Sequence, residues 1–417
     1  MIYLDKHEQM MLGGEYGSSI QKAMELLVKV GDAYNAGRMI NVNKAHVIAL
    51  PDFFDLLSAL INDGTAKILT TANPLFLNLQ TAREMNIPES FVEEGRKAVI
   101  REQEIYQRMN AIPSYTCYPY PLYDLRKGEH VAFTESNIAI FANSWFGAKT
   151  NLEGTSTAVA SAMTGKTPEY GLHLQENRHG KVLIEVAPAL EPGQFDYADY
   201  VALAHWAGGH LIDRIPVYCG LPKNITPGQA KYLCAAQIYR SAAAMFHIVG
   251  VTPEAPTTEA AFGDRRPEEK FTFGNRERKQ AYEELCSATE TRIDMVCIGC
   301  PDCTLQELAE IARLLNGRRI SKHVRLWIGT SEFFRVLAKQ MGLIDIIEGA
   351  GGLVISDMCV RFGAIPPLSD ALGVRVVATT SGSIAQNAYR RSKERTSAWF
   401  GTTKNCIDAA VTGKWEA

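Results

Sequence analysis

The chain has 417 residues, of which 46% are hydrophobic and 21% charged, and its formal net charge is −3. This length predicts about two to three domains of roughly 150 residues each, and the apolar content is that of a globular protein with a sizeable core. Because the charge is nearly balanced, the chain has no broad attraction for phosphate backbones or acidic lipids, and we expect no nucleic-acid partner.

Targeting signals are also missing from the sequence. No run of about 18 apolar residues is present, so we expect no membrane span. The N-terminal segment lacks the basic region and apolar core of a signal peptide, which predicts a cytoplasmic protein. The nine cysteines are odd in number and too sparse for a disulfide scaffold. We therefore expect free thiols, available for a metal or for catalysis.

Helical and strand-like patterns alternate from end to end of the chain. Apolar residues at helical spacing predict helices over 18–35, 53–61, 89–110, 305–315 and 331–341. Short apolar runs predict strands at 46–50, 66–71, 181–186, 215–218, 293–298, 324–328, 352–355 and 374–378. This alternation predicts a multidomain α/β fold, with parallel or mixed sheets flanked by helices and sites at the carboxyl ends of strands.

One polar stretch, rich in Pro, Glu and Arg at 253–278, interrupts this pattern. We interpret it as a linker or an excursion. The expected organisation is a first α/β region over 1–250, a linker or excursion over 251–284 and a second α/β region over 285–417.

Three motifs resemble known sites but lack a required feature. Thr164-Gly165-Lys166-Thr167 resembles the end of a phosphate-binding loop, but Ala160 stands where the signature needs glycine. The glycine-rich stretch 349–352 precedes a predicted strand, whereas a dinucleotide fingerprint follows one. His205 and His210 are not spaced as a zinc pair on a helix. None of the three is assigned a ligand.

Three of the cysteines lie in Cys297-Ile-Gly-Cys300-Pro-Asp-Cys303, directly after a predicted strand. A helix over 305–315, capped by Thr304, follows and can stabilise a thiolate at its N-terminus. The spacing resembles that of ferredoxins, but the expected fourth Cys-Pro is missing. Cys297 falls where the strand is still buried, so we interpret it as an inert core residue.

Cys117 and Cys359 also lie in loops, the first in a proline-rich loop after the long helix and the second just past a strand. Such loops can converge on one site in an α/β fold. Three thiolates could then hold an iron–sulfur cluster with one iron left open, which the spacing alone offers only as one alternative. The remaining four cysteines are explained by core packing: Cys219, Cys234, Cys286 and Cys406.

Several ordered motifs together carry a family resemblance. They are Thr116-Cys117-x-Pro119-Tyr120, Glu135-Ser136-Asn137, Ala142-Asn143-Ser144, Thr150-Asn151-x-Glu153-Gly154, Thr164-Gly165-Lys166-Thr167-Pro168-Glu169-Tyr170-Gly171, Ile298-Gly299-Cys300-Pro301 and Asp357-x-Cys359. With these motifs the whole chain resembles the large subunit of aconitase X, a divergent branch of the aconitase superfamily.

The resemblance implies an iron–sulfur cluster held by Cys117, Cys300 and Cys359, with Cys297 and Cys303 not serving as ligands. A 4Fe–4S cluster is favoured, and a 2Fe–2S cluster or mononuclear iron are the alternatives. The implied activity is that of a dehydratase, a hydro-lyase. Its open iron would act as a Lewis acid on the substrate's hydroxyl group, while a base removes a proton beside the carboxylate.

The resemblance also assigns substrate-facing residues. Glu135 and Ser136 are implied to be catalytic, and Asn73 and Pro74 to contact substrate, although helix capping explains the first pair and a plain turn the second. The family is completed by a small swivelling domain that contributes a serine base. The chain has no room for this domain, so a separate small subunit, and hence a heterodimer, is implied.

The family has two associated substrates, mevalonate 5-phosphate of isoprenoid biosynthesis and cis-3-hydroxy-L-proline. Motifs 150–154 and 167–173 favour the first. Three departures oppose it: Ala49-Leu50-Pro51 replaces a Gly-Val-Ser run, Ser383 at an expected substrate-binding position replaces lysine, and Asp302 replaces histidine. We expect a small hydroxy acid, mevalonate 5-phosphate or a similar compound, with cis-3-hydroxy-L-proline or another hydroxy acid as the alternative.

Two other functions stay open on the residues alone. The chain could be a non-catalytic subunit whose cysteines bind zinc, which takes thiolates in tetrahedral geometry without sulfide. It could also be a redox iron–sulfur protein, with Cys297 or Cys303 as a fourth ligand.

Overall fold

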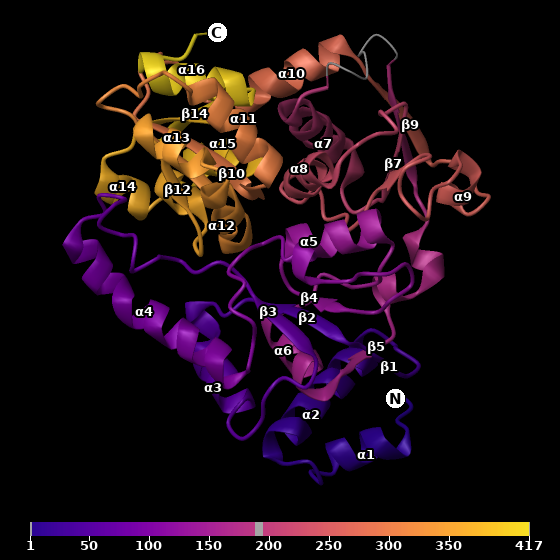
Figure 1. Cartoon of the computed structure of the whole chain (residues 1–417). Helices are drawn as coiled ribbons and strands as arrows, with labels where there is room; N and C mark the ends of the chain where they lie inside the picture. The colour runs from indigo at the N-terminus through magenta and orange to yellow at the C-terminus, as the bar shows by residue number, and fades with distance from the viewer. Residues whose placement is uncertain (1, 188–194, 417) are drawn as a thin grey trace.

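The computed structural model describes residues 2–187 and 195–416, and three regions follow one another along the chain. In Figure 1 they form a lower, an upper right and an upper left lobe that meet near helix α5. A three-stranded, a four-stranded and a five-stranded sheet, one in each lobe, have the strand orders β3-β2-β4, β8-β7-β6-β9 and β12-β11-β10-β13-β14. Every pair in these sheets is parallel. The predicted multidomain α/β fold is confirmed.

The first region covers its small parallel sheet with helices, and an antiparallel β1–β5 pair lies beside it. Its elements are α1 (Lys6–Leu12), α2 (Ser18–Ala33), β1 (Met39–Asn41), β2 (Lys44–Val47), α3 (Phe54–Leu60), β3 (Leu69–Ala72), α4 (Glu89–Arg108), β4 (Ala132–Phe133), α5 (Ser136–Phe141), α6 (Thr155–Thr164) and β5 (Lys166–Pro168). Helices α2 and α4 confirm two helices predicted from apolar spacing.

The second region packs helices against the four-stranded sheet. Its elements are β6 (Val182–Val186), α7 (Tyr197–Leu211), β7 (Pro216–Cys219), α8 (Pro227–Gln237), β8 (His247–Ile248), α9 (Thr258–Phe262), β9 (Glu269–Phe273) and α10 (Asn275–Leu285). The expected linker is corrected here, because β9 pairs with β6 along five residues and α10 packs on the same region. The charged composition of 253–278 reflects exposure: four of the five β9 residues are not buried.

The third region holds the five-stranded sheet. Its elements are β10 (Met295–Cys303), α11 (Leu305–Leu315), β11 (Arg325–Thr330), α12 (Glu332–Gln340), α13 (Leu343–Gly349), β12 (Leu353–Ile355), the 3₁₀ turn η7 (Val360–Ala364), α14 (Leu368–Leu372), β13 (Val376–Thr379), α15 (Gly382–Arg391), β14 (Ser397–Phe400) and α16 (Thr403–Thr412). The bounds of α11 match the prediction, and Thr304 caps it with a reciprocal bond from Glu307.

Strand β10 continues beyond its predicted end because Gly299 permits a close crossing. Gly299 has φ +102°, and a Cβ there would lie 2.2 Å from the carbonyl oxygen of Gly329 on β11. The register between β10 and β11 shifts between Ile298 and Cys303. Only glycine tolerates both the positive φ and the close approach. Because of this irregularity, the segment that carries Cys300 departs from the regular strand pairing at the end of the sheet.

Helix α2 is capped by a residue far away in sequence. Its own N-cap, Gly17, has no capping side chain, and Asp63 accepts hydrogen bonds from the backbone of Ser18 at 3.2 Å and of Ser19 at 2.9 Å. These hydrogen bonds and those from the serine hydroxyls lower the pKa of Asp63 to about 2. Asp63 therefore caps α2 with a negatively charged carboxylate, which stabilises the N-terminus of a helix.

We expect Asp63→Asn to lower the free energy of unfolding at neutral pH. The folded-state pKa of Asp63 lies below the value near 3.9 of an unfolded aspartate, so its contribution is complete above about pH 4 and is lost as the pH falls through about 2. Urea unfolding of both proteins across this range measures the difference. Asp52→Asn, at an exposed position, is the control. A wild-type advantage that persists unchanged at pH 2 would contradict this role.

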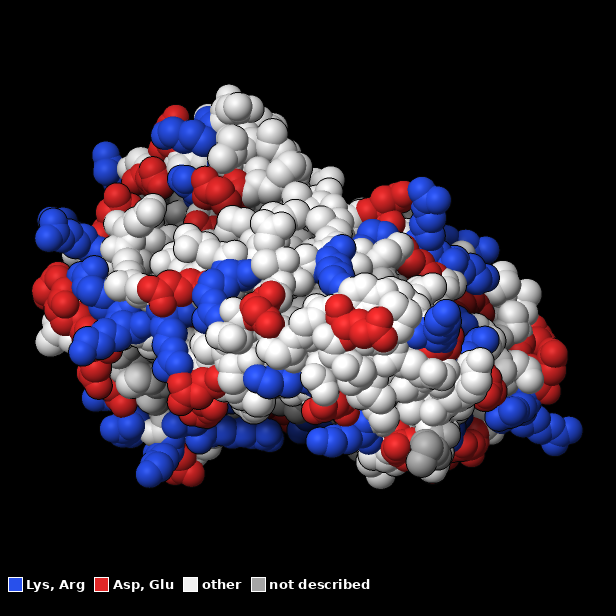
Figure 2. All heavy atoms as spheres, turned by 90° about the horizontal axis from the view of Figure 1, so that it is seen from below, with Lys and Arg blue, Asp and Glu red and all other residues white. Residues whose placement is uncertain are grey.

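Within the described ranges, no helix combines the length and apolarity that a membrane crossing requires. On the face shown in Figure 2, basic and acidic side chains are intermixed over the surface. This intermixing follows from the near balance of 43 Lys and Arg against 46 Asp and Glu.

Candidate functional site

Cys117, Cys300 and Cys359 line a single cavity of about 490 Å³. Cys117 lies in the loop after α4, Cys300 is in β10, and Cys359 follows β12 as the N-cap residue of η7. The first region and two strand ends of the third region therefore supply the three thiols. The sequence predicted a loop for each of them; the structure keeps Cys300 within β10, and the fold brings the three segments to one cavity.

Two of these thiols interact directly. Cys359 and Cys300 are hydrogen-bonded, which lowers the pKa of Cys300 below that of an ordinary thiol and raises the pKa of Cys359 well above it. Burial, followed by the carboxylates of Asp302 and Glu135, raises the pKa of Cys117. A thiolate at Cys300 is a better metal ligand than a thiol, because metals bind the deprotonated form.

The neighbouring cysteines lie outside this cavity lining. Cys297 and Cys303 are completely buried, and the Cys297 thiol donates to the carbonyl oxygen of Val360 at 3.3 Å. The interpretation of Cys297 as a core residue agrees with this position. Across the described ranges, no group of three or more His, Cys, Asp or Glu side chains is gathered closely enough around one point to hold a single metal ion. The three thiols instead line a cavity of about 490 Å³.

Glu135 and Ser136 lie at the same cavity, at the start of α5. Glu135 is the N-cap of this helix: its Oε2 accepts from the backbone N–H of Asn137 at 2.6 Å and of Ile138 at 3.1 Å. Its Oε1 accepts from the Asn137 amide at 2.9 Å. The capping alternative is thus correct, and it coexists with a position in the cavity wall. Desolvation raises the pKa of Glu135 to about 8.

Asn73 and Pro74 follow β3 and also line the cavity. The Asn73 side chain is oriented by His46 of β2, whose Nε2 lies 3.3 Å from Asn73 Oδ1. The other ring nitrogen of His46 lies 2.7 Å from the Thr71 hydroxyl. Because burial lowers the pKa of His46 to about 4, the imidazole is neutral at pH 7, with Nε2–H as the donor. This leaves the Asn73 amide nitrogen available to a ligand.

Arg361 is a residue of the site that was not predicted from the sequence. It lines the cavity two residues after Cys359, and its Nη1 donates to the Tyr239 hydroxyl at 2.7 Å and to Ser383 Oγ at 3.4 Å. Burial lowers the pKa of Arg361, but the electrostatic interactions with Cys359 and Tyr239 are together stronger, so that its pKa is raised. The spacing Cys359-Val-Arg361 was the feature of the sequence that could have indicated a place for Arg361 in the site. Ser383 is buried behind Arg361 and is not itself part of the cavity lining.

Three polar atoms of the cavity wall have no partner within the described chain. They are Arg361 Nε, Asn137 Oδ1 and Thr134 Oγ1. Buried polar groups are nearly always hydrogen-bonded in native proteins. These atoms therefore indicate a ligand that accepts from Arg361 and offers hydroxyl or similar groups to the other two.

A buried polar network joins the two loops that carry Cys117 and Cys300. The Thr116 hydroxyl donates to the Asp302 carboxylate, and Lys231 Nζ donates to the Asp302 carbonyl oxygen. Lys231 also pairs with Glu307 of α11 at 2.7 Å, at the centre of the protein. Asp302, expected as a departure from the family pattern, thus fixes the spacing of two cysteine loops and does not line the cavity.

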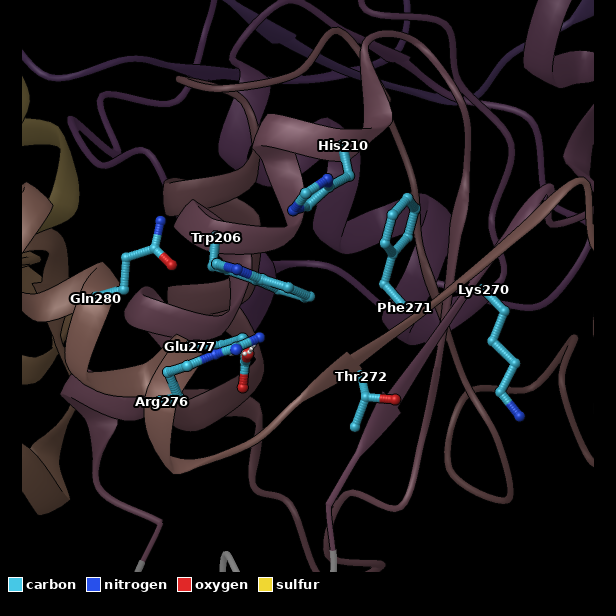
Figure 3. A pocket seen from close by; sticks show the side chains of 8 residues that line it. All are labelled: Trp206, His210, Lys270, Phe271, Thr272, Arg276, Glu277 and Gln280. Carbon is cyan, nitrogen blue, oxygen red and sulfur yellow. Dashed lines mark hydrogen bonds and ion pairs between the residues drawn. The ribbon is translucent and has the colours of Figure 1, made fainter.

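A second, larger cavity of about 670 Å³ lies between α7, β9 and the start of α10 (Figure 3). It is lined by Trp206, His210, Lys270, Phe271, Thr272, Arg276, Glu277 and Gln280. Its charges are already paired, Arg276 with Glu277 and Lys270 with Glu185 outside the lining, and the His210 ring stacks on Phe271. This cavity contains no thiol and is separate from the candidate site.

Comparison with known proteins places the whole chain in one family. Residues 1–176 match the aconitase X first domain, residues 180–283 the second and residues 293–412 the third. The structure superposes on the crystal structure of aconitase X (holo-form) from Thermococcus kodakaraensis with a TM-score of 0.84 and 32% sequence identity, covering 98% of this chain and 100% of that one.

Two relatives with named activities cover most of the chain. The phosphomevalonate dehydratase large subunit of Methanothermobacter thermautotrophicus is 36% identical over 92% of this chain and 93% of its own. The cis-3-hydroxy-L-proline dehydratase of Pseudomonas aeruginosa is 33% identical over 99% of this chain and 70% of its own. Both are hydro-lyases, which confirms the predicted enzyme class. The chain belongs to the aconitase X family.

Proposed function

We propose that the chain is the cluster-binding large subunit of a hydro-lyase that eliminates water from a small β-hydroxy acid. The observation that carries the proposal is the convergence of Cys117, Cys300 and Cys359 on one cavity that also holds Glu135 and Arg361. Thiols from three separate segments, around a space wider than a single ion needs, suit an iron–sulfur cluster better than tetrahedral zinc.

The cavity residues fit such a cluster and its substrate. Cys117, Cys300 and Cys359 would hold the cluster, with 4Fe–4S as the proposed type. When bound, it supplies a Lewis-acidic iron that activates a hydroxyl group as a leaving group. The chain itself provides the residues that bind and orient the acid around that iron.

Arg361 is suited to bind the substrate's carboxylate, since its Nε has no partner and its Nη1 is fixed by Tyr239. Asn73, oriented by His46, and Asn137 can hold the hydroxyl end. Because its pKa is about 8, Glu135 carries a proton at pH 7 and can deliver it to the departing hydroxyl. The base that removes the proton beside the carboxylate is proposed to lie on a small partner subunit, as the name "large subunit" of a relative supports.

Two acids are proposed as the substrate. Mevalonate 5-phosphate follows from the 36% identity to a phosphomevalonate dehydratase large subunit. Cis-3-hydroxy-L-proline follows from the second relative and is favoured by the single cation that the described part of the cavity wall contains. The name "large subunit" of the first relative supports a small partner subunit for this chain as well.

The test is anaerobic co-expression with the presumed small subunit, followed by analysis of iron, zinc and acid-labile sulfide. The same sample is assayed for loss of water from mevalonate 5-phosphate and from cis-3-hydroxy-L-proline. We expect iron with sulfide and turnover of one of the two acids. A protein that contains zinc and no sulfide would contradict the proposed iron–sulfur cluster. A protein that contains the cluster but eliminates water from neither acid would restrict the chain to metal binding or redox chemistry.

A further inference from the structure

The second region supplies none of the three cavity thiols, yet its helix α8 lies where the three lobes meet (Figure 1). Helix α8 packs against α5 of the first region and against β10 of the third. At this junction it carries Lys231, whose side chain is 1% exposed. A lysine is almost never buried to this extent unless its charge is paired, and the proposed reaction does not use Lys231.

The Lys231 side chain is fixed by groups on two neighbouring elements of the third region and on its own helix. Its Nζ donates to the carbonyl oxygen of Asp302, near the end of β10, and to Glu307 Oε2 of α11 at 2.7 Å. The same ammonium group lies over the ring of Tyr232, 5.0 Å from the ring centroid. Glu307 is fixed in turn, because its carboxylate also accepts from the Tyr232 hydroxyl and from the backbone N–H of Thr304 at 2.9 Å. The end of β10, two residues after its proposed ligand, is therefore held at one point of α8.

The first region is held at the same residue. The hydroxyl of Tyr118, which follows Cys117, donates to the backbone carbonyl oxygen of Lys231 at 3.0 Å. The hydroxyl of Thr116, which precedes Cys117, donates to the carboxylate of Asp302. One residue of α8 is therefore bonded to both ligand segments, to the first through its main chain and to the second through its ammonium group.

Stability alone does not account for this buried ion pair. Removing a lysine and a glutamate from water is costly, and apolar residues of similar volume are often as stable or more stable in their place. A buried pair can instead specify which elements meet and in what register. Residues that support metal ligands act in a comparable way, because they orient the ligands and so change the affinity for the metal.

We propose that Lys231 is a positioning residue, which fixes the Cys117 loop against the segment of Cys300 so that both thiols face one cluster. The second region thereby takes part in assembling the site, although it provides none of the proposed ligands. This inference rests on the proposed function for the cluster, whereas the order of the two segments is a property of the chain itself.

The test replaces both charges together, in Lys231→Met/Glu307→Gln, because a single substitution would leave the other charge buried and unpaired. Amide hydrogen exchange is followed by mass spectrometry in the full chain, co-expressed with the proposed small subunit, before and after bound metal is removed with EDTA. In the metal-free variant we expect exchange over 114–122 and 299–304 to be about ten-fold or more faster than in the wild type. The urea midpoint of unfolding should be no lower, and the loaded protein should lose iron to EDTA about ten-fold or more faster.

The matched control is Lys166→Met/Glu8→Gln. Lys166 and Glu8 form the same kind of pair at 2.7 Å, with side chains 13% and 4% exposed. Glu8, like Glu307, belongs to the capping box of its helix. Neither residue of the control pair lines the cavity. Exchange over 114–122 and 299–304, and the rate of iron loss, should therefore remain as in the wild type.

Three results would overturn the proposal: unchanged exchange in both segments, a uniform rise over all three regions with a lower urea midpoint, or faster exchange without faster iron loss. Tyr118→Phe removes the hydrogen bond from the Cys117 loop to α8 and decides the matter if the double variant does not fold. Exchange over 114–122 should then rise while that over 299–304 does not, and an unchanged 114–122 would overturn the proposal. A wild-type protein without iron and sulfide would contradict the proposed function alone, because exchange in the metal-free chain is read independently of the cluster.

Discussion

Serine at Cys117, Cys300 or Cys359 is expected to remove the iron and the acid-labile sulfide from the protein. Each thiol lines the same cavity and comes from a different segment, so none can be replaced by its neighbour. Loss of a residue that only supports a ligand typically costs 10–100-fold in activity, and we expect more than about 100-fold here. The measurements are iron and sulfide content, the visible spectrum and the rate of water elimination.

Matched controls lie on either side of Cys300, one of the three proposed ligands. Cys297→Ser and Cys303→Ser change completely buried thiols that do not line the cavity, and both proteins should keep iron and sulfide. They should unfold more easily, since a hydroxyl replaces a buried thiol. Loss of the cluster in Cys303→Ser, at a wild-type level of folding, would contradict the three-ligand site and favour a fourth thiolate.

The elements of this fold were predictable where local sequence decides them. The α11 helix, with Thr304 as cap and Glu307 as its reciprocal partner, has both its apolar spacing and its capping residues in one short stretch. The segments that carry Cys300 and Cys359 were found because predicted strands precede them, and the loop that carries Cys117 because it is rich in proline and follows a long predicted helix. The stretch 253–278 was interpreted as a linker or an excursion because β9 is a largely exposed edge strand that begins with Glu269 and Lys270, and its apolar alternation is limited to Phe271-Thr272-Phe273. Its pairing with β6 joins residues that are 87 positions apart in the sequence, such as Val182 and Glu269.

The site was predictable only in part, for the same reason. The positions of Asn73, Glu135 and the three cysteines follow from motifs, and the structure brings all five to one cavity. Which oxygen of Glu135 caps the helix, and which atoms remain without partners, depend on contacts that no motif encodes.

Other parts of the same motifs are structural. Asn143, in the motif 142–144, donates its amide to Thr150 O at 2.9 Å and to Ala244 O at 3.0 Å. The fully buried Arg178 donates to the Asn143 carbonyl oxygen at 3.0 Å. These bonds fix the π-helical turn over Ala142–Phe146 that continues α5, and so they hold the helix whose first turn carries Glu135. Sequence similarity alone does not separate these residues from those that touch a ligand.

Arg361 could not be assigned from the sequence, because a lone arginine after a cysteine is more often a solvated surface group. The structure instead surrounds it with Tyr239, Ser383 and the three cavity thiols, and leaves its Nε without a partner at the cavity. An arginine in this setting is preorganised: its guanidinium plane is fixed before any acid binds, so little side-chain entropy is lost on binding.

We expect Arg361→Met to lower kcat/KM for the hydroxy acid by at least about 100-fold, because one or two charge-assisted hydrogen bonds worth about 1.5–3 kcal/mol each are lost. Arg361→Lys keeps the charge but not the two-pronged geometry and should lose less. Arg375→Met, at an arginine paired with Asp370 at 3.3 Å, is the control. Iron and sulfide content must be measured in each variant, since Arg361 also stabilises the thiolates. A fully loaded Arg361→Met protein with unchanged kcat/KM would show that the carboxylate binds elsewhere.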